Sequence, residues 1–111
     1  MKEEIRVLII DPESGIREET VRNDLKTLQD LVGGKIEIVG YIPGIVLIVD
    51  EEGKLKSKPL CRTMCTHTGI RLDTLVGTVV VAGTDGEEFR GLDDNELAEL
   101  KKRLADLTIY V

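Results

Sequence analysis

Residues 23–49 read NDLKTLQDLVGGKIEIVGYIPGIVLIV, and this stretch decides the expected fold. Asn23 is a favourable helix N-cap, and Asp24 follows it in the first turn, near the positive end of the helix dipole. Gly33 and Gly34 end the helix because glycine readily adopts the positive φ of a C-cap. Between these ends, apolar residues recur at helical spacing, at Leu25, Leu28, Leu31 and Val32.

Strands follow this helix. Residues 36–42 alternate and are rich in β-branched side chains, Pro43-Gly44 forms a turn, and residues 45–49 are a second apolar run. Asp50-Glu51-Glu52-Gly53 has the composition of the next turn. Residues 54–58 then read as a short return strand, which predicts a three-strand meander in the middle of the chain.

The flanking segments extend this pattern. Residues 6–10 predict a buried strand, and residues 16–21 a partner strand joined to it by the turn at 11–15. Residues 59–74 show no clear periodicity, whereas residues 75–82 are again strand-like. Asp93 and Glu96 resemble a capping box. A final helix with one apolar face follows, formed by Leu97, Leu100, Leu104 and Leu107.

The order of these elements is typical of an α+β domain, because strands and helices do not alternate regularly. We expect one domain over residues 1–111. It should contain two helices and a mixed or mostly antiparallel sheet of about five to six strands.

Composition excludes several classes of protein. The 111 residues include 15 basic and 21 acidic side chains, which gives a net charge of −6. Net acidity argues against general nucleic-acid binding, and the three aromatic residues offer little surface for stacking bases. The N-terminus lacks the pattern of a signal peptide, and no apolar stretch approaches the ~20 residues of a membrane span. Two cysteines do not make a disulfide framework. We therefore expect a soluble, cytoplasmic protein that does not bind membranes.

The distribution of charge is more informative than its total. From Lys54 through Leu72 the chain has five of its basic residues and none of its acidic ones. A local anion-binding surface on an acidic protein is one interpretation. Lysines that protect an exposed strand edge from aggregation are the other. The candidate ligand-binding residues are Lys54, Lys56, Lys58, Arg62, Thr66, His67 and Arg71.

Cys61, Cys65 and His67 are the other candidate for chemistry. Thiolates and imidazole bind zinc, but a structural site needs four ligands, and Asp73 completes a set only if the loop folds back. A cysteine nucleophile must lie within about 3 Å of the His67 ring. Cys65 is two residues from His67, and residues at that spacing in a strand lie roughly 7 Å apart. No phosphate-binding glycine motif occurs. We expect no metal, no cofactor and no catalytic residues.

Several short segments resemble a known family. A leucine-faced helix passes through Val32-Gly33-Gly34 directly into an Ile-Glu strand. Further matching segments are Asp50-Glu51-Glu52-Gly53-Lys54, Pro59-Leu60-Cys61-Arg62, Val76-Gly77-Thr78 and Phe89-Arg90-Gly91-Leu92. Together these segments make the chain similar to the small bacterial and phage proteins called domain of unknown function 3846. The family favours Asn-Arg where this chain has Cys61-Arg62, which puts any role carried over to position 61 in doubt.

The resemblance implies an accessory protein of a phage, plasmid or other mobile element, with no assigned enzyme activity. From this resemblance we expect host manipulation, either by binding a host protein or by sequestering an immune nucleotide signal. We expect a non-catalytic binding module for a nucleotide-like anion or an acidic protein partner. A nucleotide or phosphoester hydrolase that uses the 61–73 loop is a second hypothesis, and a protein-binding or structural module without a small-molecule ligand is a third. Homo-oligomers are expected to form through strand edges or the last helix.

Overall fold

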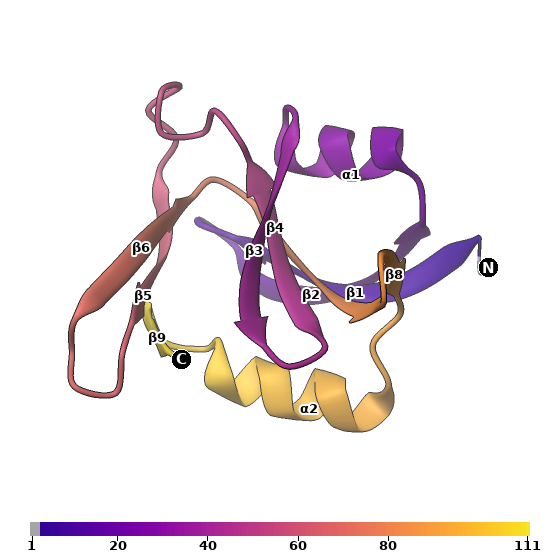
Figure 1. The fold of residues 1–111 in the computed structure, drawn as a ribbon. Helices are drawn as coiled ribbons and strands as arrows, with labels where there is room; N and C mark the ends of the chain where they lie inside the picture. The colour runs from indigo at the N-terminus through magenta and orange to yellow at the C-terminus, as the bar shows by residue number, and fades with distance from the viewer. Residues whose placement is uncertain (1–2) are drawn as a thin grey trace.

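The computed structural model describes residues 3–111 and contains two sheets and two helices in that range (Figure 1). The first hairpin joins β1 (Glu4–Asp11) to β2 (Gly15–Arg22), as expected. Helix α1 (Leu25–Val32) comes next, followed by the hairpin of β3 (Ile36–Ile42) and β4 (Ile45–Asp50).

The second half of the chain adds more strands than expected. β5 (Leu60–Cys65) and β6 (Arg71–Val76) form a hairpin, as do β7 (Val79–Asp85) and β8 (Glu88–Arg90). Helix α2 (Asp94–Arg103) and β9 (Thr108–Tyr110) follow.

The larger sheet is antiparallel and has six strands. Its order is β2-β1-β7-β4-β3, and β8 pairs with β7 beside this path. The smaller sheet has the order β6-β5-β9, in which β9 runs parallel to β5. The expected α+β class with two helices and a mostly antiparallel sheet is therefore confirmed. The small sheet is a second layer that the sequence did not predict.

Apolar side chains pack on both faces of the large sheet. One core contains Leu28 and Val32 of α1, packed on the odd-numbered residues of β1. The other contains Leu97, Leu100 and Leu104 with residues of the small sheet. Figure 1 shows α1 and α2 on opposite sides of the large sheet, with the small sheet at one end. A strand of this sheet is thus buried on both faces, which explains the nearly continuous apolar runs of β1, β4 and β7.

The predicted strand over 54–58 is wrong, and so is the three-strand meander. Residues 51–57 form consecutive turns, in which Lys56 N–H donates to Glu52 O and Lys58 N–H to Gly53 O. Asp50 starts these turns, because its side chain accepts the backbone N–H of Glu52 at 2.9 Å. The alternation of lysines in this segment therefore does not reflect a strand.

Three other element boundaries also differ from expectation. The N-cap of α1 is Asp24, whose side chain accepts the N–H of Thr27, so Asn23 lies one residue before the cap. The strand expected over 75–82 is divided at Gly77, whose φ of +71° lets the chain turn from β6 into β7. The two strands over 60–76 were not predicted because irregular register at two places in β5 interrupts the alternation.

The C-terminal helix begins as expected and ends earlier than expected. Asp93 and Glu96 form both hydrogen bonds of a capping box. The helix ends at Arg103, and Leu104 is its C-cap. Leu107 lies beyond it and is 65% exposed, so it does not continue the apolar face. No helix in residues 3–111 is long and apolar enough to cross a bilayer.

Two leucines of α1 test this packing. Leu28 is 1% exposed and Leu25 is 58% exposed. We expect Leu28→Ala to lower the free energy of unfolding by about 2–5 kcal/mol, because it leaves a cavity in the core. Leu25→Ala should change it by about 0.5 kcal/mol or less. Chemical denaturation measures both, and equal losses would contradict this placement of α1.

Candidate functional site

Asp50 lies at the end of β4 and is the centre of a cluster of charges. Its side chain is 1% exposed, and Oδ2 lies 2.8 Å from Lys56 Nζ and 2.7 Å from Lys58 Nζ. Oδ1 accepts the N–H of Glu52. A buried carboxylate is stable only when it has such partners, because burial removes its hydration.

Both lysines also contact the end of α1. Lys58 Nζ donates to Val32 O at 2.7 Å, and Lys56 Nζ donates to Gly33 O at 3.0 Å. These carbonyl groups lie at the negative end of the helix dipole, where cations are stabilising. We call Asp50, Lys56, Lys58 and these two carbonyls the Asp50 cluster. It connects β4, the 51–58 turns and α1.

Gly34 makes room for this cluster. A Cβ at Gly34 would lie 2.6 Å from Asp50 Oδ1 and 2.7 Å from Lys56 Nζ. Gly33 takes a φ of +85° as the C-cap of α1. The two glycines, which end the helix as predicted, therefore also allow the lysines to reach the helix end.

Opposing effects set the pKa of Asp50. Burial by itself raises the pKa of this carboxyl group. The hydrogen bonds from Lys56, Lys58 and Glu52 lower it and outweigh burial, so the pKa of Asp50 is well below its usual range. Asp50 is therefore ionised in the folded protein at neutral pH.

The other residues of the candidate anion site lie in three further places. Lys54 Nζ lies 2.9 Å from Asp73 Oδ1 on β6. Arg62 is 6% exposed. Its Nε donates a hydrogen bond to Leu104 O at the end of α2, and its Nη1 donates one to Cys61 O. The three lysines and Arg62 thus all have intramolecular partners.

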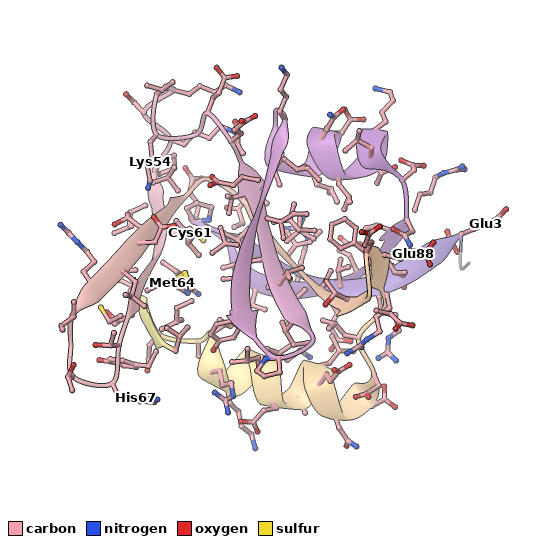
Figure 2. All side chains as sticks on the ribbon, in the orientation of Figure 1. Glu3, Lys54, Cys61, Met64, His67 and Glu88 are labelled. Carbon is pink, nitrogen blue, oxygen red and sulfur yellow. The ribbon has the colours of Figure 1, made fainter. Side chains whose placement is uncertain are left out.

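Thr66, His67 and Arg71 lie at the far end of the small sheet. Thr66 and Thr68 are hydrogen-bonded in the turn between β5 and β6, and His67 and Arg71 are exposed. In Figure 2, Lys54 is near the upper end of the small sheet and His67 near the lower end. The structure therefore separates the seven residues instead of joining them in one pocket.

The two cysteines are buried, whereas the histidine is exposed. Cys61 is fully buried with its Sγ directed to Ile10 O at 3.6 Å, whereas His67 is exposed. Burial raises the pKa of the Cys61 thiol to about 11, which leaves it protonated at neutral pH. Within residues 3–111, no three Cys, His, Asp or Glu side chains are placed to hold a metal ion. The 61–73 segment is a hairpin of two strands and not an open loop.

The sequence did not single out Asp50 as the partner of the lysines. The sequence did contain a feature that could have indicated it, since this acidic residue directly follows the apolar run of β4. The sequence also missed a cleft of about 560 Å³ where β1 and β8 diverge. Its two arginines are bound by carboxylates outside the lining, Arg6 by Asp94 and Arg90 by Glu96. The remaining charges of this cleft are acidic, the opposite of an anion site.

The Asp50 cluster predicts a pH dependence of stability. A carboxyl group whose pKa is lower in the folded state stabilises the fold above its unfolded pKa, about 4, and this contribution is lost as pH falls further. Asp50→Asn should reduce the free energy of unfolding at pH 7 by about 3 kcal/mol, because it leaves two ammonium groups without their carboxylate.

The difference between wild type and Asp50→Asn should shrink below about pH 4, where Asp50 begins to be protonated as the chain unfolds. Denaturation at a series of pH values measures it. Asp30→Asn is the matched control, since the Asp30 side chain is 68% exposed and, within residues 3–111, pairs only with Lys26. A constant difference across the pH range would contradict the role of Asp50.

Gly34 provides a steric test of the same cluster. Gly34→Ala should cost about 1–3 kcal/mol, because the added methyl group displaces Asp50 or Lys56. Gly40→Ala on β3 is the control, since a Cβ there meets nothing within 4 Å. Thermal and chemical denaturation measure both. If the two variants unfold alike, the close approach at Gly34 is not significant.

Comparison with known proteins places the chain in a family. No curated protein and no solved structure matches it significantly. One family model matches residues 5–105, which covers nearly all of the 111 residues. The match includes the segments that form the Asp50 cluster and confirms the resemblance seen in the sequence. The chain belongs to the family described as domain of unknown function (DUF3846).

Proposed function

We propose that this chain is a non-catalytic binding module that captures an acidic segment of a protein partner through the turn of the β5–β6 hairpin and the first residues of β6. In the setting that the family resemblance suggests, this partner is a protein of the host of a mobile element. The observation that carries the proposal is that exposed apolar and basic side chains gather at the turn end of this hairpin, with Arg71 and Leu72 on opposite faces of β6. We call this region the hairpin surface, formed by His67, Ile70, Arg71 and Leu72.

Exposure of this surface supports the proposal. Ile70 is 63% exposed and Leu72 is 53% exposed, which is unusual for two large apolar side chains so close in sequence. Arg71 and His67 are also exposed. Arg71 takes no part in the ion pairs formed within residues 3–111. Arginine is enriched at protein interfaces and among the residues that contribute most of their binding energy.

The chemistry of these side chains favours a carboxylate-bearing partner. A guanidinium group binds carboxylates with two parallel hydrogen bonds. The nearest acidic residue of the hairpin, Asp73, is already bound by Lys54. The hairpin surface thus keeps a local positive charge although the whole chain carries −6.

A protein partner is favoured over a small nucleotide because the cations do not converge. Lys56 and Lys58 bind Asp50, and Arg62 is buried against α2. Binding a phosphate with these residues requires breaking the Asp50 cluster or exposing a core residue. The buried, protonated thiol of Cys61 likewise gives no support to a hydrolase.

Affinity capture with a charge-matched control tests the proposal. The immobilised wild type, Arg71→Glu and Lys102→Glu are incubated with host lysate, and captured proteins are quantified by mass spectrometry. Arg71→Glu should lose at least about tenfold of the specific capture, equivalent to about 1.4 kcal/mol. Lys102→Glu, which makes the same charge change on the exposed face of α2, should retain it.

A thermal-shift measurement with nucleotides tests the alternative, that the chain binds a small anion. Cyclic and linear nucleotides should not shift the thermal midpoint of the wild type. A nucleotide-induced shift of the wild-type midpoint would overturn the proposal in favour of anion capture. Lysate capture that Arg71→Glu leaves unchanged would also overturn it.

A further inference from the structure

Strand β9 is an edge of the small sheet with main-chain groups directed outward. Leu107 O accepts the N–H of Thr63 at 2.8 Å, and Val111 N–H donates to Cys65 O at 3.0 Å. The odd-numbered residues of this segment therefore bond to β5. Because main-chain groups alternate along a strand, the N–H and C=O groups of Thr108 and Tyr110 point to the open edge.

This edge lacks the protection that the other edges have. β2 carries the charged residues Arg17, Glu18, Glu19 and Arg22, and β3 has an irregular register beside Gly40. β6 carries Arg71 and Asp73, and its register with β5 is also irregular. Residues 107–111, in contrast, are Leu-Thr-Ile-Tyr-Val, without a charged side chain, proline or glycine. Unprotected edges of this kind pair readily with another strand.

We propose that β9 pairs with β9 of a second copy of this chain, antiparallel across a two-fold axis. Thr108 then lies opposite Tyr110 of the second copy, and Tyr110 opposite Thr108. Each of these two pairs exchanges two main-chain hydrogen bonds. The two small sheets become one continuous six-stranded sheet with the order β6-β5-β9-β9-β5-β6.

The side chains of residues 107–111 suit this register. Leu107 is 65% exposed and Tyr110 is 50% exposed. In the antiparallel pair, Leu107 faces Val111 of the second copy on the inner side of the sheet, and Tyr110 faces Thr108 on the outer side. Apolar and aromatic–threonine pairs of this kind stabilise antiparallel strands.

Charge favours a second copy at this edge and not at the others. Each copy carries −6, so two copies repel unless they meet where the charge is low. Residues 107–111 place no charged side chains opposite one another, whereas β2 carries four charged side chains, Arg17, Glu18, Glu19 and Arg22. The hairpin surface lies at the opposite edge of the small sheet, on the β6 side, and remains available for the partner proposed above.

Backbone amide exchange distinguishes this contact from any other dimer. It is measured by NMR at low-micromolar and near-millimolar protein, with light scattering for the mass. Ile109 and Val111 should be protected at both concentrations, because their N–H groups bond to β5. Thr108 and Tyr110 should become protected, by at least about tenfold, only where the dimer forms.

Two variants and a matched control complete the test. Leu107→Lys, and Tyr110→Pro, which removes an outward N–H that β5 does not use, should both give monomers. Ile38→Lys changes an exposed apolar residue on the edge strand β3 and should leave the dimer intact. A monomer at all concentrations, a dimer without protection of Thr108 and Tyr110, or a dimer broken by Ile38→Lys would each overturn the proposal.

Discussion

A single buried carboxylate, Asp50, anchors the 51–58 turns, which contribute no residue to either hydrophobic core, to β4 and to the end of α1. Two lysine ammonium groups satisfy it, and the same groups donate to the last carbonyls of α1. Because a buried charge without partners is costly, the 51–58 turns have to fold back over the helix end. This requirement fixes where the chain leaves the large sheet and enters β5, and thus where the small sheet begins.

The position of the small sheet in turn determines which surfaces are available for binding. Its inner side contributes Met64, Leu75 and Ile109 to the core beneath α2, and Arg62 binds the end of that helix. Its two edges differ in chemistry, since β6 carries a charged hairpin and β9 an uncharged strand. A partner protein and a second copy of the chain can therefore occupy opposite edges of the same sheet.

Local signals in the sequence predicted much of the fold. The hairpin of β1 and β2, the end of α1 at Gly33, the strands β3 and β4 and the capping box of α2 are all set by contacts within a few residues. The prediction failed between residues 54 and 77, after the correctly predicted turn at 50–53. There a side chain, Asp50, replaces the backbone pairing of a strand, and irregular register hides the period of β5. Such features depend on partners distant in sequence, which periodicity does not detect.

The sequence by itself determined the class of the fold, the family and the concentration of basic residues between Lys54 and Leu72. Only the tertiary structure decided what those residues do. The sequence does not show which charged side chains will be in contact. In the folded chain, Asp50 and Asp73 pair with the three lysines of this segment, and Arg62 is buried. What was one basic segment became a set of internal contacts, with Arg71 and His67 left on the surface of the hairpin.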